Sequence, residues 1–245
     1  MLNIVLPIAG RGSRFAVAGY EQPKPLIPVH GAPMIAAVVR NVRPRCAHRF
    51  IFVALAEHLE RDGMREALTA AAPGCVIVPV EHVTEGAACT VLLAKQHIDT
   101  DDALMLANSD QWVDIEIDDY LASMDRQRAD GLIMTMQADD PKWSFVGLDR
   151  KRLVTRVVEK EVISNEATVG IYNFRRGCVV CCRRRFDCQQ GDTDRRRRRT
   201  SGLRKRCVAW WESSCHGHRR SGHSRAEFPW HTWPSVIAAC SFPSR

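Results

Sequence analysis

The sequence predicts an α/β fold, with a mixed, mostly parallel sheet that carries helices on both faces. Short apolar runs at residues 4–8, 49–55 and 75–80 are typical of buried strands. Between these runs, residues 33–39 and 59–72 are predicted helices, and the second is alanine-rich with charges on one face. Because strands and helices alternate, each helix returns the chain to the edge where the next strand begins, which indicates parallel strands.

The same alternation continues through the middle of the chain. Residues 91–98 and 118–129 are predicted helices, and Pro33 suits the first turn of the helix that it opens. Further strands are predicted at residues 103–107, 132–136, 153–158 and 164–173. A chain of 245 residues is long enough to bury the core of one such domain.

The positive charge of the chain is concentrated in its last part. The formal net charge is +7, but residues 1–174 contain 18 Lys and Arg against 23 Asp and Glu, a net of −5. Residues 175–245 contain 17 against 5, a net of +12. The basic balance therefore gives no evidence that the predicted core binds nucleic acid, and no nucleic-acid partner is expected.

Sequence features of membrane and secreted proteins are missing. No apolar run approaches the roughly 18 residues of a membrane span, and the chain begins on a predicted strand rather than on a signal peptide. Only Cys46, Cys75 and Cys89 lie in the first 174 residues, and scattered cysteines fit a reduced protein without disulfides. We therefore expect a cytoplasmic protein with no membrane partner.

A glycine-rich stretch, residues 9–15, follows the first predicted strand. A strand that ends in such a turn leaves backbone N–H groups pointing outward, where they can bind an anion. Gly10 and Gly12 have no Cβ, so the backbone can approach a phosphate closely, and Arg14 and Lys24 add positive charge. Taken alone, these residues fit a tight turn with a surface arginine equally well.

The spacing of this stretch resembles a known signature. Gly10-x-Gly12-x-Arg14, followed by Pro23-Lys24-Pro25-Leu26, is similar to the opening of the sugar-phosphate nucleotidyltransferases. It is neither a Walker A motif nor a dinucleotide-binding fingerprint, because the lysine and the third glycine that these require are missing. The resemblance covers about residues 1–177 and implies a Rossmann-like nucleotide-diphospho-sugar transferase fold of the GT-A-like type.

The resemblance also implies roles for residues near the nucleotide. Arg14 and Lys24 would be catalytic, because they would neutralise the phosphates of a nucleoside triphosphate. The other nucleotide-binding residues that it implies are Ala9, Gly10, Gly12 and Ser13 in the loop, with Thr84, Gly86 and Ala87 at the base. From the residues alone, Thr84 reads as the N-cap of the following helix.

Asp110 is the candidate metal ligand. It follows the predicted strand 103–107, and ligands bind at the carboxyl ends of parallel strands in open α/β sheets. A carboxylate there suits Mg²⁺, although an Asx turn in a loop is an equally simple role for an isolated aspartate. The resemblance favours the metal. The segment Asn108-Ser109-Asp110-Gln111 matches a bacterial subgroup that is often found with capsule and surface-polysaccharide genes.

The last part of the resemblance implies a site for an acceptor. Glu159 would bind acceptor hydroxyls and Lys160 the acceptor phosphate, although an adjacent Glu-Lys pair is commonly a surface ion pair. Trp143, Ser144 and Gly170 would shape the acceptor pocket. The family usually has a second metal-binding carboxylate beyond this point, and none is recognisable here.

Residues 178–245 differ from everything before them. Arg, Cys, Trp, His and Ser are enriched together, and no helical or strand period is present. The arginines could bind nucleic acid, and Cys207, Cys215, His216 and His218 could bind zinc. A third interpretation is an out-of-frame translation of a high-GC gene, which we favour because the resemblance stops within a few residues. We therefore divide the chain into a nucleotidyltransferase core, residues 1–177, and a tail, residues 178–245.

These inferences lead to a predicted reaction. We expect a nucleotidyltransferase that uses Mg²⁺ to transfer a nucleoside monophosphate from an NTP to a sugar phosphate or similar acceptor, with release of pyrophosphate. The product would serve surface-polysaccharide synthesis. One alternative is a glycosyltransferase of the same fold, although Asn108-Ser109-Asp110 lacks its usual Asp-x-Asp motif. The other is a truncated, non-catalytic remnant. The base, the acceptor and the oligomeric state stay open.

Overall fold

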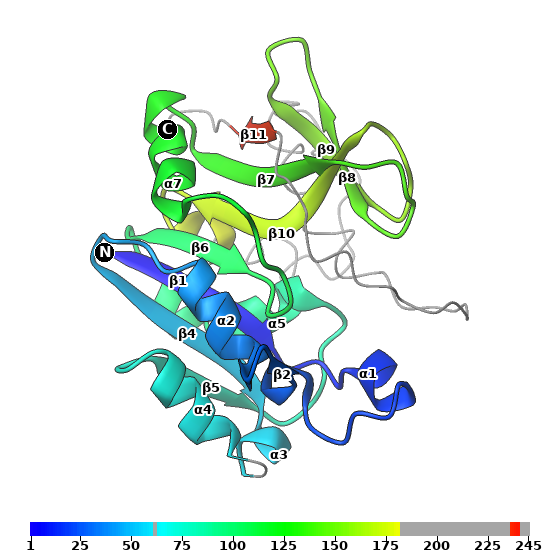
Figure 1. The fold of residues 1–245 in the computed structure, drawn as a ribbon. Helices are drawn as coiled ribbons and strands as arrows, with labels where there is room; N and C mark the ends of the chain where they lie inside the picture. Colours follow the sequence, from blue (N-terminus) through cyan, green and yellow to red (C-terminus); the bar gives the residue numbers. More distant parts are fainter. Residues whose placement is uncertain (61–62, 182–235, 241–245) are drawn as a thin grey trace, which may run out of the picture.

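The computed structural model of the chain describes residues 1–60, 63–181 and 236–240. Within these residues, nine strands form one sheet in the order β11-β7-β10-β6-β1-β4-β5, and β8 and β9 extend from β10 (Figure 1). The strands are β1 (Leu2–Ile8), β4 (His48–Leu55), β5 (Val76–Val80), β6 (Ala103–Ala107), β7 (Gly131–Gln137), β8 (Ser144–Leu148), β9 (Val154–Glu159), β10 (Glu166–Phe174) and β11 (Val236–Cys240). Two short strands, β2 (Pro28–Val29) and β3 (Ala32–Pro33), form a separate antiparallel pair.

Half of the sheet is parallel, as the alternation of strands and helices predicts. The central strand β1 pairs in parallel with β4 on one side and with β6 on the other, and β4 pairs in parallel with β5. The carboxyl ends of these four strands therefore lie at one edge. The loops that follow β1, β5 and β6 contain the predicted nucleotide and metal residues.

The other half of the sheet is antiparallel. β10 pairs with β6, β7 and β8, β8 pairs with β9, and β11 pairs with β7 at the edge. The predicted mixed α/β sheet is confirmed. Two strands of this sheet were not predicted, and neither were the short strands β2 and β3. β8 contains Gly147, which weakens a strand pattern, and β11 lies where the sequence has no strand period.

Helices cover both faces of the sheet, also as predicted. α2 (Met34–Asn41), α4 (Met64–Ala71) and α7 (Ile117–Arg126) pack on one face together with Ile4 and Leu6 of β1. α5 (Ala87–Leu93) and α6 (Lys95–Ile98) pack on the other face together with Val5. Successive side chains of β1 therefore enter opposite cores. None of the helices in the described ranges is both long and apolar enough to cross a bilayer.

Two predicted helices are divided in the structure. In place of one helix over 59–72, α3 (Ala56–Leu59) is followed by α4, which begins after Gly63. Gly63 has a φ of 71°, a left-handed conformation that no regular helix contains. The predicted helix over 91–98 begins earlier, at Ala87, and consists of α5 and α6.

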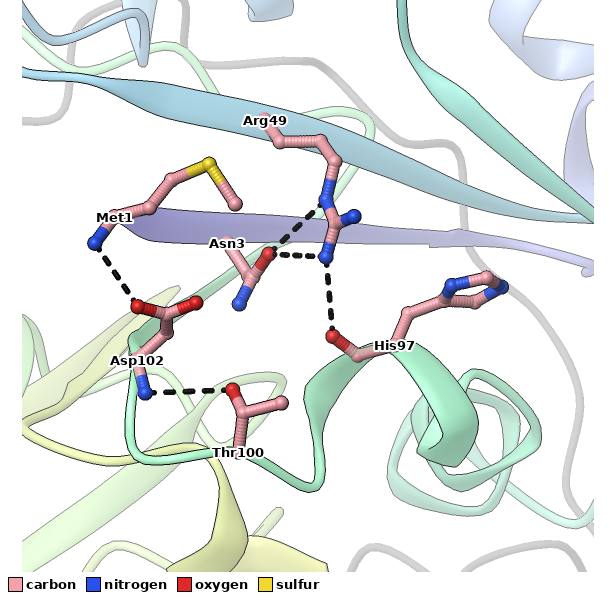
Figure 2. Close-up of polar contacts among 6 residues, drawn as sticks. All are labelled: Met1, Asn3, Arg49, His97, Thr100 and Asp102. Carbon is pink, nitrogen blue, oxygen red and sulfur yellow. Dashed lines mark hydrogen bonds and ion pairs between the residues drawn. The ribbon is translucent and has the colours of Figure 1, made fainter.

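A polar cluster fixes the amino-terminal ends of the parallel strands. Figure 2 shows Arg49 of β4 donating to Oδ1 of Asn3 on β1 at 2.8 and 3.2 Å, and to the carbonyl oxygen of His97 at 3.2 Å. In the same figure, the N-terminal ammonium of Met1 pairs with Asp102 at 3.0 Å, just before β6. This end of the sheet is tied together by its own residues, whereas the predicted site lies at the opposite end.

Candidate active site

The glycine-rich loop leaves β1 at buried Ala9 and leads into the short helix α1 (Ser13–Val17). The N–H groups of Gly10, Arg11 and Gly12 donate to no other described residue. Gly12 has a φ of 60°, and a Cβ there would lie 3.2 Å from Cβ of Lys24. Gly12 therefore lets the loop pack directly on Lys24, as a residue with a side chain could not without a shift.

Gly10 differs from Gly12 in its surroundings. A Cβ at Gly10 would meet no atom within 4 Å, and the backbone there is not left-handed. The folded chain therefore gives no internal reason for glycine at this position. The loop can accept an anion here, because its N–H groups are available and no side chain blocks the approach.

Lys24 and Asp110 form an ion pair. Lys24 belongs to a single 3₁₀ turn, η1 (Lys24–Leu26), behind the loop, and Asp110 follows β6. Their side chains are 21% and 30% exposed, so the pair lies near the surface without being fully solvated. The structure thus brings together two residues that are 86 positions apart and that were predicted for different roles, phosphate binding and metal binding.

Aromatic side chains of the loop flank this lysine. The ammonium of Lys24 lies 5.6 Å from the ring centroid of Phe15, within the range of a cation–π interaction. Tyr20 packs edge-on against Phe15, with 5.9 Å between the ring centroids. Sequence reasoning gave Phe15 no role, although its place next to Arg14 in the signature was a usable signal. Arg14 lies on α1, in the same turn.

The loop that carries Asp110 is anchored on both sides. The Asn41 side chain at the end of α2 donates to the Val113 carbonyl oxygen at 2.8 Å and accepts from the Val113 N–H at 2.9 Å. At the start of the loop, the Asn108 N–H donates to the carbonyl oxygen of Gly170 at 3.0 Å. Neither Asn41 nor Asn108 was predicted to have a role. No local pattern marks Asn41, whereas Asn108 belongs to the segment that suggested Asp110.

The donor set at Asp110 suits a metal that brings other ligands with it. Among the described residues, no group of three or more His, Cys, Asp or Glu side chains is placed to hold a metal ion. Mg²⁺ commonly binds through one or two carboxylates and takes its other oxygens from phosphates and water. Asp110 therefore fits a Mg²⁺ ion that is shared with a bound polyphosphate, and it does not fit a closed protein site.

The predicted base-binding residues lie where β5 passes into α5. Gly86 precedes α5 with extended backbone, at a φ of −178°. Thr84 is not the helix cap that the local sequence predicts. Its hydroxyl donates to the Gly86 carbonyl oxygen at 3.0 Å and lies 2.6 Å from the Thr90 hydroxyl, so it braces the turn. α5, which begins at Ala87, packs against β1, the strand that leads into the glycine-rich loop.

Four of the five predicted acceptor residues gather at one end of the β8–β9 pair, whereas Gly170 lies on β10, next to Asn108. Ser144 is paired with Glu159 across the two strands, and the Lys160 N–H donates to the Trp143 carbonyl oxygen at 2.9 Å. Lys160 pairs with Glu159 at 3.1 Å and is 59% exposed, as in an ordinary surface pair. Within the described ranges, no hydrogen bond or ion pair links these four residues to Lys24 or Asp110.

A second lysine lies beside Trp143. The Lys142 ammonium is 5.4 Å from the Trp143 ring centroid and pairs with Asp140 at 2.8 Å. The hydrogen bonds that Lys142 donates hold the pKa of the Asp140 carboxyl below its usual range. This end of the β8–β9 pair therefore presents an aromatic ring with fixed positive charge next to it.

Comparison with known families identifies the chain. The family model described as Nucleotidyl transferase matches residues 3–194, which include β1 to β10 with the loop, Lys24 and Asp110. The chain belongs to the nucleotidyl transferase family. The predicted family is confirmed, and its capsule-associated subgroup stays a prediction.

The chain is similar to known proteins at low sequence identity. The Bifunctional protein GlmU of Methanococcus aeolicus is 24% identical over 177 residues, which are 71% of this chain and 40% of that protein. The chain thus spans two fifths of the length of that relative. A nucleoside-diphosphate-sugar pyrophosphorylase from Vibrio cholerae has a TM-score of 0.62 at 24% identity, with 86% of each chain covered. The inositol-1-phosphate CTP transferase from T. maritima also has a TM-score of 0.62, at 13% identity, with 76% of this chain and 75% of that one covered.

These structural neighbours establish the fold of the nucleotidyl transferase. Its predicted Rossmann-like, nucleotide-diphospho-sugar transferase architecture is confirmed by them. The predictions for the tail concern residues of which 182–235 and 241–245 lie outside the described part of the chain.

Proposed function

We propose that this nucleotidyl transferase joins a nucleoside monophosphate from an NTP to the phosphate of a sugar phosphate or similar small acceptor, and releases pyrophosphate. The observation that carries the proposal is the Lys24–Asp110 pair beside the glycine-rich loop. Cation, carboxylate and available N–H groups meet at one edge of the parallel strands, as an activated phosphate chain requires. The name of the nucleoside-diphosphate-sugar pyrophosphorylase neighbour supports the sugar-phosphate acceptor.

The reaction that we propose is a direct in-line displacement. A phosphate oxygen of the acceptor attacks the α-phosphorus of the NTP. The bond from this phosphorus to the oxygen that bridges it to the β-phosphorus breaks, and its electron pair leaves with pyrophosphate. Nucleotide and acceptor end joined through a diphosphate. No covalent enzyme intermediate is needed, so the protein supplies position and charge.

Each part of the site has a proposed task in this displacement. The N–H groups at Gly10 and Gly12, with Arg14, bind the β- and γ-phosphates. Lys24 neutralises negative charge on the α-phosphate as the acceptor oxygen approaches. Thr84, Gly86 and Ala87 line the base. A Mg²⁺ ion held by Asp110 would supply further positive charge to the phosphate oxygens when bound.

The acceptor site that we propose is the end of the β8–β9 pair. Lys160 binds the acceptor phosphate, Glu159 its hydroxyls, and Trp143, Ser144 and Gly170 shape the pocket. The Glu159–Lys160 pair supports this, because a surface ion pair is weak and each side chain can leave it to contact a ligand at little cost in free energy. The Asn108 to Gln111 segment supports a role in making precursors of surface polysaccharide.

A pyrophosphate-release screen tests the proposed function. The chain is incubated with Mg²⁺, each of CTP, UTP, dTTP, ATP and GTP, and a panel of sugar phosphates. We expect release only with a matched pair, and a loss of at least about 100-fold in Asp110→Asn. Lys95→Met is the matched control, because Lys95 pairs with Asp99 on α6, on the sheet face opposite α2 and α4.

Two results of this screen would contradict the proposal. Release of pyrophosphate that Asp110→Asn leaves unchanged would place the reaction elsewhere. No pyrophosphate release with any pair, together with turnover of a nucleotide-sugar supplied in place of the NTP, would indicate a glycosyltransferase of the same fold. The second result is not expected, because a glycosyltransferase would release no pyrophosphate for the positive charges of Arg14 and Lys24 to hold.

A further inference from the structure

In the ion pair of Lys24 and Asp110, the residue proposed to bind the nucleotide phosphate is paired with the residue proposed to bind the metal. The Lys24 ammonium lies against the Asp110 carboxylate and over the Phe15 ring, and no other ion pair to Asp110 is present within the described residues. In this arrangement the charge of the carboxylate is already neutralised. A divalent cation that approached Asp110 would meet the positive charge of Lys24 at the same carboxylate.

The described residues offer the metal no ready-made protein site at Asp110. Among them, no group of three or more His, Cys, Asp or Glu side chains is placed to hold a metal ion. A metal ion alone would gain one shared carboxylate in exchange for part of its hydration shell, which Mg²⁺ gives up reluctantly. A polyphosphate removes both obstacles to metal binding. It gives Lys24 another anion to pair with, and it gives the metal more oxygen ligands.

We propose that Lys24 keeps metal off Asp110 until a nucleotide phosphate takes the lysine away. This inference rests on the proposed function and adds an order of events to it. The carboxylate becomes a metal ligand only in the nucleotide complex, so metal and nucleotide bind together. By linkage, the metal must raise the affinity for nucleotide by the same factor as the nucleotide raises the affinity for metal.

The test uses Mn²⁺ as a paramagnetic probe of the full chain. Line broadening of the backbone amides of residues 108–113 is measured by NMR as Mn²⁺ is added without nucleotide. We expect Lys24→Met and Lys24→Gln to reach half-broadening at about tenfold less Mn²⁺ than the wild type. The effect should vanish when Asp110→Asn is added to Lys24→Met.

Three controls bound this experiment. Lys95→Met removes a lysine from another Lys–Asp pair and should behave as the wild type. Amides near Asp101 and Asp102, at the amino ends of the strands, report binding to surface carboxylates and should be equal in all variants. Thermal melts by circular dichroism show whether each variant folds. If only one of the two Lys24 variants folds, that variant alone is enough for the comparison with the wild type.

A second titration adds the nucleotide that raises the melting temperature most. In the wild type, this nucleotide should lower the Mn²⁺ needed at residues 108–113 to at most the level of nucleotide-free Lys24→Met. Equal Mn²⁺ dependence of wild type and both Lys24 variants without nucleotide would overturn the inference. So would a nucleotide that binds without changing the Mn²⁺ dependence. If no nucleotide raises the melting temperature, the proposed function fails, while the first titration still decides whether Lys24 excludes the metal.

Discussion

The carbonyl oxygen of Gly170 accepts a hydrogen bond from the backbone N–H of Asn108, with 3.0 Å between nitrogen and oxygen. Gly170 has a φ of 79°, and a Cβ there would lie 2.1 Å from Nδ2 of Asn108. The side-chain amide of Asn108 thus occupies the space that a side chain at position 170 would need. This contact joins β10 to the loop of Asp110, where the parallel and antiparallel halves of the sheet meet.

We expect Gly170→Ala to lower the free energy of unfolding by about 2–4 kcal/mol, from left-handed strain and from the clash with Asn108. Gly74→Ala is the matched control, because Gly74 has a φ of 77° and open space around it. Adding Asn108→Ala should relieve the steric part and leave the strain. Urea denaturation measures all four proteins. Equal losses in Gly170→Ala and Gly74→Ala would show that the contact has no energetic weight.

Gly10→Ala and Gly12→Ala should separate binding from folding. Gly10 has open space and no left-handed backbone, so Gly10→Ala should leave the melting temperature unchanged while it weakens nucleotide binding by about tenfold. Gly12→Ala should lower both the melting temperature and the affinity for nucleotide, because the new Cβ meets Lys24 at 3.2 Å. Thermal shift with and without NTP measures both effects. Unchanged nucleotide affinity in Gly10→Ala would contradict a phosphate at this loop.

Asn41→Leu should loosen the loop of Asp110 without unfolding the sheet. Its two hydrogen bonds with Val113 are each worth about 1 kcal/mol. We expect the Val113 amide to exchange with solvent faster by at least tenfold, while the amides of β4 keep their protection. Hydrogen exchange followed by NMR measures this. Equal acceleration at Val113 and in β4 would instead indicate global destabilisation.

Cys75 and Cys46 should differ in reactivity. Burial raises the pKa of the Cys75 thiol, whereas Cys46 is exposed. A raised pKa means that the folded state holds the thiol proton to higher pH. Cys75 should therefore react with iodoacetamide more slowly than Cys46, and its rate should rise at a higher pH than that of Cys75 in the unfolded chain. Peptide mass spectrometry at several pH values measures the rates.

The same shift has a consequence for stability, with a fixed sign. Because the folded pKa of Cys75 is raised, its contribution to stability is complete below the unfolded pKa and is lost as the pH rises through the folded value. Cys75→Ala should remove this alkaline loss. A wild-type thiol in the folded state that reacts as fast as Cys46 would contradict the burial effect.

The parallel half of the sheet could be predicted from the sequence because each of its strands contains a continuous apolar run. The run at residues 103–107 has the bounds of β6, and the run at residues 75–80 exceeds β5 by one residue. The break at Gly63 and the strand β8 could not be predicted. Both depend on backbone conformation and pairing between distant segments, which leave weak local patterns.

The candidate site divides in the same way. The glycine-rich loop, Lys24 and Asp110 stood out because their residue types and spacing resemble a family signature. Three further contacts belong to the tertiary structure. Lys24 pairs with Asp110, Phe15 flanks the lysine, and Asn41 holds the Asp110 loop. They follow from the meeting of segments that the sequence places far apart, so no local pattern encodes them.

Phosphorus-31 NMR of the complete reaction tests the central claim most directly. The wild-type chain, Mg²⁺ and the matched NTP and sugar phosphate should consume the three NTP resonances. They should yield equal amounts of pyrophosphate and of a sugar-linked nucleoside diphosphate, and Asp110→Asn should yield neither. A nucleoside diphosphate with orthophosphate would mean hydrolysis, and a nucleoside diphosphate with a doubly phosphorylated sugar would mean phosphoryl transfer. Either result would contradict nucleotidyl transfer at the Lys24–Asp110 site.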